Sequence, residues 1–346
     1  MRIGVVAPVW IPVPPPGYGG VELVVSLLVE ELVARGHDVT LFASGDSQTK
    51  ANLRSVYEVA PTDRIWEVEP DAVHVGAAYT YATTQYRDGE GFDLIHDHTN
   101  YLGVAFAATL STPVLHTVHM VLDEDRAAFL KRFSGEVYLT AISQYQRKEV
   151  PDLPWRGTIH NAVDVDAFPF RSDKEDYLLC LGRVCERKGQ DLAIEVARRA
   201  GMPLVLAGRV HPKEAWFFEE RILPHVDADR VIFHGEVSNE RKAELLAGAR
   251  ALLFPVREPE PFGLAMAEAL ACGTPVVAPA LGAVPEVVTN GETGFFATGV
   301  RAMAEAAERV SELSPARCRS EAEARFHLQT MVDGYESMYR AILAEL

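Results

Sequence analysis

The sequence has 346 residues, of which 48% are hydrophobic and 24% charged, a composition typical of a globular protein long enough for two domains. Its formal net charge of −16 argues against a nucleic-acid partner and against broad binding to anionic lipid, because phosphates would be repelled. The four cysteines show neither metal-site spacing nor a secreted disulfide framework. With no signal peptide and no apolar run of membrane-spanning length, the sequence predicts a cytoplasmic protein with reduced thiols.

The first half of the chain alternates strand and helix patterns. A helix is expected over 21–35, and the segment 46–69 is polar and irregular, so we expect loops facing an acceptor there. The acidic residues from Asp123 are expected to start another helix. The alternation indicates a parallel sheet with helices on both faces. Continuous apolar runs predict its strands at 3–7, 39–43, 92–96, 113–118 and 137–142.

Glycine and histidine residues follow several of these strands. Gly19 and Gly20 stand between the first strand and the first helix, at the edge where a doubly wound sheet binds ligands. They form either a plain loop or a place where backbone N–H groups approach a phosphate or a transferred sugar. His98 and His119 follow later strands, and a structural role is the commoner one for any single histidine in such a place.

A second alternating series begins after Phe170 and predicts a second sheet. Its long amphipathic terminal helix is expected over 321–346. Two doubly wound halves of similar size would leave a cleft between them, which is where small-molecule sites usually lie. The predicted strands of the second sheet are 177–181, 204–207, 231–233, 251–255 and 275–278, with helices at 190–199 and 240–249.

The stretch 256–279, VREPEPFGLAMAEALACGTPVVAP, is the most informative part of the sequence. It predicts a helix that starts with Pro261 in its first turn and ends at Cys272. The positive end of that helix would suit a phosphate. Glu260 stands at its start and Glu268 up to roughly 12 Å along its axis, so the two carboxylates could hold the two ends of a nucleotide sugar. Alternatively, Glu260 only stabilises the helix and Glu268 lies on a solvated face.

A cation pair lies in an earlier loop of the same half. Arg183 and Lys188 stand five residues apart in a glycine-flanked loop that opens a helix. A pyrophosphate needs such a pair near a helix N-terminus. Either residue alone is more often a solvated charge, so the prediction depends on their occurrence together with the Pro-Phe-Gly sequence.

Four segments resemble the retaining glycosyltransferases of family 4, which have the GT-B fold of two Rossmann-like α/β domains. They are EPEPFGLAMAEALACGTPVVAP, GRVCERKGQDLAIEVA, HNAVDVDAF and PPPGYGGVE. The resemblance covers nearly the whole chain. It departs from the family pattern at Ala162, where glycine is usual, and after Gly208. The family fold implies an acceptor-side domain of 1–168 plus about 331–346 and a donor-binding domain of 169–330.

The resemblance also implies roles for individual residues. Glu260 would bind hydroxyls of the donor sugar, and Glu268 would hold the ribose hydroxyls. Arg183 and Lys188 would neutralise the leaving pyrophosphate, and His119 would lie over the donor sugar. The remaining expected contacts are base recognition near Val237, backbone N–H groups of Phe262, Gly263 and Leu264, and phosphate or acceptor contacts at Gly19, Gly20 and Gly208.

The implied reaction moves a hexose from a UDP- or GDP-linked sugar to a hydroxyl of a small-molecule, glycan or lipid acceptor. By resemblance it retains configuration by front-face attack and needs neither a metal nor another cofactor. Alternatives are a sugar-nucleotide 2-epimerase or hydrolase, a lectin-like binder, and a metal-dependent transferase using Asp-x-Asp at 123–125 or 164–166. A weak peripheral membrane contact has only two small candidates, 131–133 and 147–148, for which a solvated face is the preferred interpretation.

Overall fold

The computed structural model describes residues 1–346, which form two compact units. The first unit is Met1–Asn161 with Leu328–Leu346, and the second is Ala162–His327. These divisions fall a few residues before the boundaries of 168 and 331 that the sequence predicts. Both ends of the second unit meet locally, because the N–H of Val163 donates to the carbonyl of Phe326 and Val163 bridges to His327.

The first unit is built on a parallel sheet of seven strands in the order β3-β2-β1-β4-β5-β6-β7. The chain runs outward from β1 to β3, then returns to the other side of β1 for β4, so the order reverses between β1 and β4. Ligands bind at such a reversal in sheets of this type. The strands are β1 (Arg2–Val6), β2 (Asp38–Phe42), β3 (Asn52–Arg54), β4 (Leu94–Asp97), β5 (Val114–Val118), β6 (Tyr138–Ala141) and β7 (Trp155–Thr158).

Helices cover this sheet, and one of them corrects the sequence prediction. The irregular region predicted for 46–69 contains the short strand β3, and the long helix α2 begins within it at Val68. Its buried residues Val75, Ala78, Tyr79 and Ala82 follow the i, i+3, i+4, i+7 spacing of an amphipathic helix. The helices of this unit are α1 (Gly20–Ala34), α2 (Val68–Arg87), α3 (Leu102–Ala107), α4 (Glu124–Phe133), α5 (Gln144–Glu149) and α13 (Leu328–Leu343).

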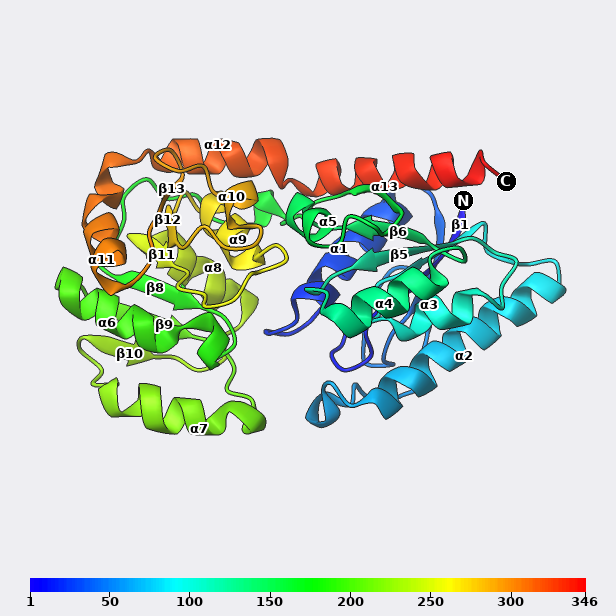
Figure 1. The fold of residues 1–346 in the computed structure, drawn as a ribbon, viewed down its shortest axis with the longest axis horizontal. Coiled ribbons are helices and arrows are strands. Elements are labelled where there is room, and N and C mark those ends of the chain that lie inside the picture. Colours follow the sequence, from blue (N-terminus) through cyan, green and yellow to red (C-terminus); the bar gives the residue numbers. More distant parts are fainter. The chain divides into compact units, whose positions relative to one another are not determined.

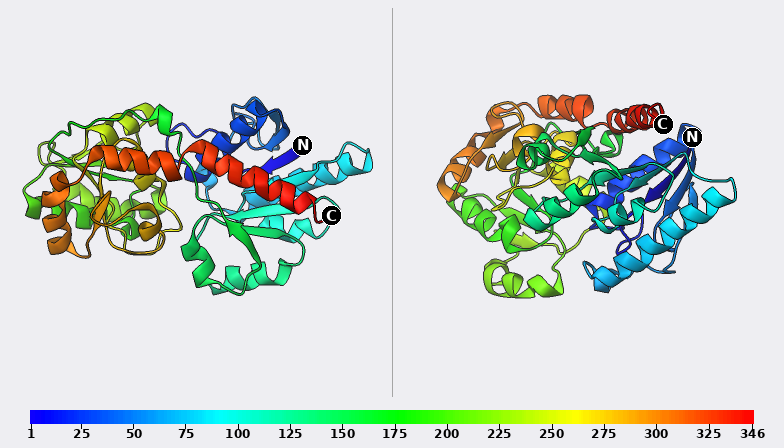
Figure 2. Two further views of the ribbon diagram at one scale, coloured as in Figure 1. Left: turned by 90° about the horizontal axis from the view of Figure 1, so that it is seen from above. Right: turned by 45° about the vertical axis from the view of Figure 1, so that its right-hand side comes forward.

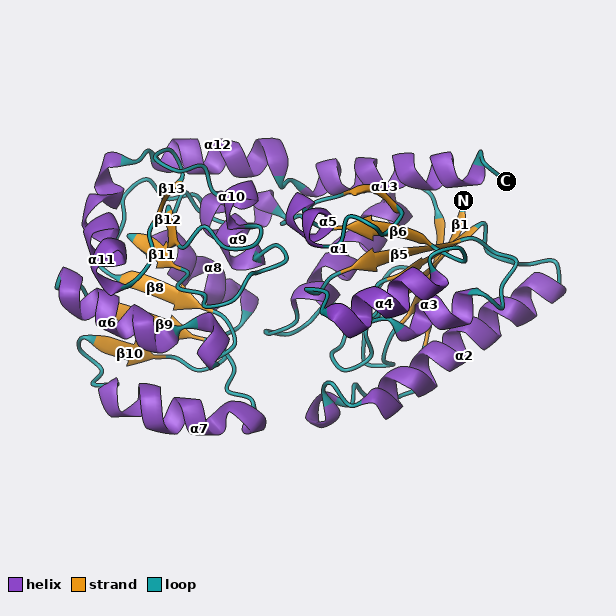
Figure 3. Cartoon of the chain, in the orientation of Figure 1, coloured by secondary structure: helices purple, strands orange, loops and turns teal.

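The second unit has a parallel sheet of six strands in the order β10-β9-β8-β11-β12-β13, which reverses between β8 and β11. Figure 3 shows the strands of each unit enclosed by helices. Every strand predicted in either half lies within two residues of an observed one, because buried parallel strands are continuous apolar runs. The strands are β8 (Leu178–Leu181), β9 (Leu204–Ala207), β10 (Val231–Phe233), β11 (Ala251–Leu253), β12 (Val276–Ala278) and β13 (Gly294–Phe296).

The helices of the second unit pack in neighbouring pairs. Helix α6 contacts α11, beside which it lies in Figure 1, and α9 contacts α12. Residues of α6 and α11 contribute to the same apolar core as strands β8 and β9. The helices are α6 (Gln190–Ala200), α7 (Ala215–Phe217), α8 (Asn239–Gly248), α9 (Leu264–Ala271), α10 (Val284–Val287), α11 (Val300–Arg309) and α12 (Pro315–Arg325).

The single helix predicted over 321–346 is wrong. Two helices, α12 and α13, are separated by Phe326 and His327. Phe326 is fully buried with a non-helical φ of −121°, and its carbonyl accepts the N–H of Val163 instead of continuing a helix. Long-range pairing therefore interrupts a sequence pattern that is locally helical.

Ion pairs within the first unit connect helix α13 to the residues that follow α1. The Arg35 guanidinium donates to the carboxylates of Asp333 and Glu336 at 2.6 and 2.7 Å. His37 Nε2 lies 2.6 Å from the other oxygen of Glu336. Both chain ends belong to this unit and lie on the same side of it in Figure 1, and Figure 2 gives two further views of them.

Candidate active site

The loops that follow β8 and β11 meet where the strand order of the second unit reverses. A Cβ on Gly189 would lie 2.1 Å from the carbonyl oxygen of Pro255, so only glycine permits this approach. The N–H of Arg257 donates to the carbonyl of Arg187, and the Arg257 guanidinium forms two bonds of 2.8 and 2.7 Å to the Asp191 carboxylate. The loops after β8 and β11 are therefore held together at the carboxyl edge of the second sheet.

Lys188 and Glu260 form an ion pair across this edge. Lys188 Nζ lies 2.7 Å from Glu260 Oε1 and 5.4 Å from the centre of the Phe254 ring. The Glu260 side chain is 11% exposed and that of Lys188 is 22% exposed. The structure thus brings together two residues that the sequence assigned to one site.

The backbone of Glu260 is held by a loop that sequence analysis missed. A Cβ on Gly282 would lie 2.4 Å from the carbonyl oxygen of Glu260 and 2.5 Å from its nitrogen, and Gly282 has a φ of +59°. The N–H of Ala283 donates to the same carbonyl at 2.9 Å. The only sequence signal was a glycine shortly after a predicted strand, which is too common to identify a contact.

The helix predicted from Pro261 begins later than expected. Helix α9 starts at Leu264 with Gly263 as its N-cap, so Pro261 and Phe262 lie before the helix. Gly263 has a φ of +88°, which an L side chain rarely adopts, and this turn delays the helix. The N–H groups at the helix start are those of Leu264 and Ala265, which have no acceptor within the helix. Phe262 instead buries its ring against Phe326, 5.6 Å between ring centres.

Glu268 has a partner that the sequence did not reveal. Its Oε1 lies 2.6 Å from Nζ of Lys242 on helix α8, and the Glu268 side chain is only 5% exposed. Lys242 lies 26 residues away in a different helix, so no local spacing connects the two. A carboxylate this deeply buried is expected to have a cationic or hydrogen-bonded partner.

The other predicted donor-site residues lie on neighbouring loops at the same edge of the sheet. The backbone of Arg183 is held by Gln190, whose Nε2 donates to the Arg183 carbonyl at 2.9 Å. A Cβ on Gly208 would lie 1.8 Å from the carbonyl oxygen of Gly182, so the loops after β8 and β9 touch through glycine backbone. The N–H of Gly208 donates to the carbonyl of Gly235, two residues before the half-buried Val237.

In the first unit, Gly19 and Gly20 start helix α1 at the reversal of strand order. Gly19 is the N-cap with a φ of +147°, and a Cβ there would lie 2.7 Å from Cβ of Pro15. Glu22 in the first turn is buried, and burial raises the pKa of its carboxyl to about 7. This carboxyl was not singled out from the sequence.

Four histidines lie on β4 and β5 or directly after them: His96 and His116 within the strands, and His98 and His119 immediately after them. His119 Nε2 is 2.9 Å from His98 Nδ1, and the ring of His98 packs on that of His96 with 3.9 Å between centres. Burial lowers the pKa of His98 well below its usual range and that of His119 to about 3, although His119 as a whole residue is half-buried. His116 Nδ1 lies 3.3 Å from the Asp97 carboxylate.

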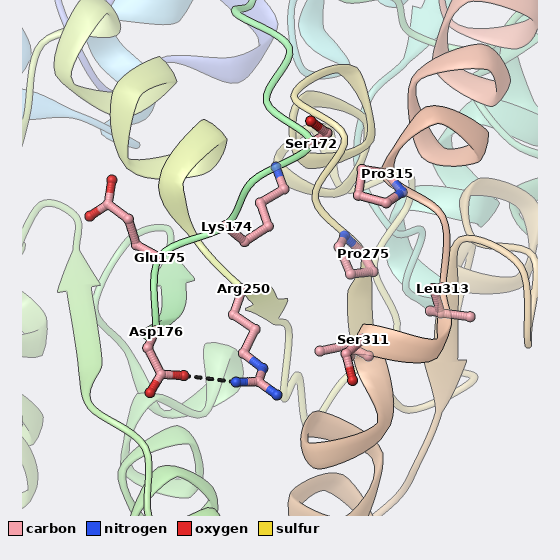
Figure 4. Close-up of a pocket in the computed structure, with 10 residues that line it drawn as sticks. Ser172, Lys174, Glu175, Asp176, Arg250, Pro275, Ser311, Leu313 and Pro315 are labelled. Atoms are coloured by element: carbon pink, nitrogen blue, oxygen red, sulfur yellow. Dashed lines mark hydrogen bonds and ion pairs between the residues drawn. The ribbon is translucent and has the colours of Figure 1, made fainter.

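A cavity of about 460 Å³ opens at the opposite edge of the second sheet (Figure 4). Lys174 at its wall donates three hydrogen bonds, to the carbonyls of Ala247 and Cys272 and to Thr274 Oγ1. Arg250 pairs with Asp176 at 2.8 Å, the interaction drawn dashed in Figure 4. These partners link the ends of helices and strands, so we do not place the active site there.

The Asp-x-Asp candidates have other partners. Asp123 caps helix α4 by accepting from the N–H of Arg126 at 2.8 Å. Asp166 lies 3.8 Å from Arg319 and 3.5 Å from His327 on the exposed surface of the second unit. Neither follows directly on a strand.

The fold and these residues define a two-unit α/β protein with an ion-paired polar site at a strand-order reversal. The model of the family "Glycosyltransferase Family 4" matches residues 18–167, and that of "Glycosyl transferases group 1" matches residues 164–326. The N-acetyl-alpha-D-glucosaminyl L-malate synthase of Bacillus anthracis is 35% identical, over 95% of this chain and 96% of that protein. The chain belongs to glycosyltransferase family 4 and is a transferase enzyme.

More distant relatives and solved structures agree with this. A D-inositol 3-phosphate glycosyltransferase of Acidothermus cellulolyticus is 26% identical over 94% of this chain and 86% of its own length. The crystal structure of AviGT4, a glycosyltransferase of avilamycin A biosynthesis, superposes with a TM-score of 0.76 at 26% identity, covering 100% and 99% of the two chains. A sucrose-phosphate synthase from Thermosynechococcus elongatus reaches a TM-score of 0.83 at 22% identity over the full length of both chains.

The GT-B fold predicted from the sequence is therefore confirmed. No helix in the structure is both long and apolar enough to cross a lipid bilayer.

We predict that Glu22→Gln flattens the dependence of unfolding free energy on pH. The carboxyl takes up protons more readily when folded, with a pKa near 7 against an ordinary value of 4.5. Its contribution to stability is therefore complete below pH 4.5 and is lost as the pH rises through 7. Denaturant titrations at several pH values should show the wild type losing about 3 kcal/mol relative to Glu22→Gln across this range. Exposed Glu308→Gln is the control, and parallel profiles for wild type and Glu22→Gln would contradict the prediction.

We also predict that Lys242→Met is more damaging than removing both members of its pair. The single change leaves the Glu268 carboxylate buried without its cation, which should cost about 3 kcal/mol of unfolding free energy. Lys242→Met with Glu268→Gln should recover most of that loss. Denaturant unfolding of the four proteins in the cycle measures this, and an equal loss in single and double variants would refute a coupled pair.

Proposed function

We propose that this enzyme transfers a hexose from a UDP- or GDP-linked sugar to a hydroxyl group, with retention of configuration and without a metal. The ion pair of Lys188 and Glu260, at the reversal of strand order and beside the starts of α6 and α9, is the observation that carries the proposal. Similar folds support the donor class, since HepE from Anabaena has been crystallised with UDP and with UDP-glucose. We assign donor binding to the second unit and acceptor binding to the first.

The main electrostatic demand of this reaction lies on the leaving group. As the bond from the anomeric carbon to the phosphate oxygen breaks, negative charge grows on the diphosphate and the sugar becomes positively charged. In our proposal Lys188 and Arg183 stabilise that negative charge, with the N–H groups at the start of α9. These fixed cations would serve in place of a metal ion at the diphosphate.

The partners of the two glutamates favour front-face attack. Glu260 is paired with Lys188 and Glu268 with Lys242, so we assign neither as a nucleophile for a covalent intermediate. We propose that the acceptor oxygen attacks from the side that the phosphate leaves. The new bond forms from that oxygen to the anomeric carbon, and its proton passes to the leaving phosphate oxygen. Glu260 would then bind sugar hydroxyls.

The remaining roles follow the proposed assignment of donor binding to the second unit and acceptor binding to the first. Glu268 would hold the ribose hydroxyls, and the backbone at Val237 would contact the base. Gly263 and Leu264 would offer backbone N–H groups to the sugar or phosphates. His119 of the first unit would bind the transferred sugar, and Gly19 and Gly20 would admit the phosphate or the acceptor. The names of two relatives specify the hydroxyl-bearing acceptors inositol 3-phosphate and L-malate, which supports a small polyhydroxyl or hydroxy-acid acceptor.

We predict that Lys188→Ala lowers turnover by about 10²-fold or more, because a charge that stabilises the transition state is lost. Stability should change far less, since the Lys188 side chain is partly exposed. Initial rates with saturating donor and thermal unfolding measure the two effects. The neighbouring Arg187→Ala is the matched control, because Arg187 pairs with the exposed Glu258. Normal turnover of Lys188→Ala would remove Lys188 from the mechanism.

Nucleotide binding tests the donor class and the role of metal independently of any acceptor. Calorimetry with UDP, GDP and ADP and their common sugars should show tight binding of one nucleoside diphosphate, unchanged by EDTA. Arg183→Ala should weaken that binding by tenfold or more, since one charge-assisted contact contributes about 1.5–3 kcal/mol. Binding that disappears with EDTA would overturn the metal-free proposal, and no binding of any nucleotide would overturn the donor assignment.

A further inference from the structure

We propose that His98 is a positioning residue that acts through His119, because the hydrogen bond between their rings selects the nitrogen that His119 presents to substrate. This inference rests on the sugar-binding role proposed above for His119. His98 follows β4 and His119 follows β5, so neighbouring strands of the first sheet hold both backbones at its carboxyl edge.

The geometry leaves one nitrogen of each ring available. His98 Nδ1 and His119 Nε2 are 2.9 Å apart, and the rings are nearly parallel, with 28° between their planes. His119 Nδ1 and His98 Nε2 are shielded from solvent and have no hydrogen-bond partner in the protein. Because a buried polar atom without a partner costs free energy, Nδ1 of the half-buried His119 is poised to gain a partner from a bound molecule.

The protonation of the two unpartnered nitrogens, His119 Nδ1 and His98 Nε2, is linked. Burial favours the neutral form of both rings, so each carries a single N–H. One of these two hydrogens must lie in the bond between the rings. If His119 supplies it, His119 Nδ1 is a bare acceptor and His98 Nε2 carries the other hydrogen. If His98 supplies it, His119 Nδ1 is a donor. The tautomer of His98 thus decides whether His119 offers a donor or an acceptor.

A cluster of buried rings fixes the position of His98. The His96 ring lies 3.9 Å from that of His98, centre to centre, and both His96 nitrogens are engaged, Nδ1 with the Tyr339 hydroxyl at 2.6 Å and Nε2 with Thr117 Oγ1 at 2.7 Å. Tyr335 packs edge-on against His98 at 6.3 Å. His98 is 1% exposed, so it has little freedom to turn away from His119. This rigidity is what a positioning residue requires.

The test combines substitutions at both histidines. His98→Leu should lower kcat by about 10²-fold with little change in KM for the donor, because His119 loses its fixed orientation. His98→Asn places an amide near the position of Nδ1 and should restore kcat to within about tenfold of wild type. In a His119→Ala background, His98→Leu should have no further effect on kcat. Nitrogen-15 NMR should show a mixed His119 tautomer in His98→Leu and one tautomer in the wild type.

The possible outcomes distinguish the sugar-binding role of His119 from the positioning role of His98. If His119→Ala keeps full turnover, the role proposed for His119 is wrong. If His119→Ala loses turnover while His98→Leu keeps it, or if the two losses add in the double variant, His98 does not act through His119 and the inference is overturned. Should His98→Leu fail to fold, the kcat of His98→Asn and the tautomer of His119 in that variant still decide the question.

Discussion

The ion pair between Lys188 and Glu260 joins two loops, and its two residues are 72 positions apart in the sequence. Its formation depends on the strand order and on glycine contacts of the second unit. The pair needs the ends of β8 and β11 to be adjacent, which the reversal of strand order provides. It also needs the loops to approach at backbone distance. Gly189 permits that approach, and Gly282 brings the loop after β12 against the backbone of Glu260, because a side chain at either glycine would collide with a carbonyl oxygen. The site is therefore a consequence of topology together with glycine placement.

The two buried glutamates of the candidate site require local compensation in a chain of net charge −16. Glu260 and Glu268 each receive one lysine from a different segment, at 2.7 and 2.6 Å. Because the desolvation of a charge is costly, removing Lys242 would penalise Glu268, the more deeply buried of the two carboxylates. The same cations are suitable for binding a diphosphate, so the ion pairs of the glutamates would also prepare the site for an anionic ligand.

Local patterns in the sequence predicted ten of the thirteen strands and few of the long-range contacts. Buried parallel strands are continuous apolar runs, whereas the three strands that were missed, β3, β7 and β13, are short, partly exposed and at sheet edges. The start of α9 was misplaced because Pro261 suits a first helical turn, whereas the left-handed conformation of Gly263 sets the actual start. The break at Phe326 depends on a hydrogen bond from Val163, and the partner of Glu268 comes from another helix. Glu260, Arg183 and Lys188 were predicted from residue spacing and His119 from motif resemblance, whereas the contacts of Glu260 with Gly282 and of His119 with His98 required the fold.

The two units differ in the electrical character of their polar groups, and this difference fits the proposed reaction. The second unit presents fixed charges in pairs, whereas the first presents imidazoles that burial keeps neutral. A transfer of this kind develops negative charge on the leaving phosphate and positive charge on the sugar. Fixed cations would be favourable beside the phosphate, but a protonated imidazole would oppose the positive sugar. A neutral His119, held by a neutral His98, would contribute a hydrogen bond to the sugar without that electrostatic penalty.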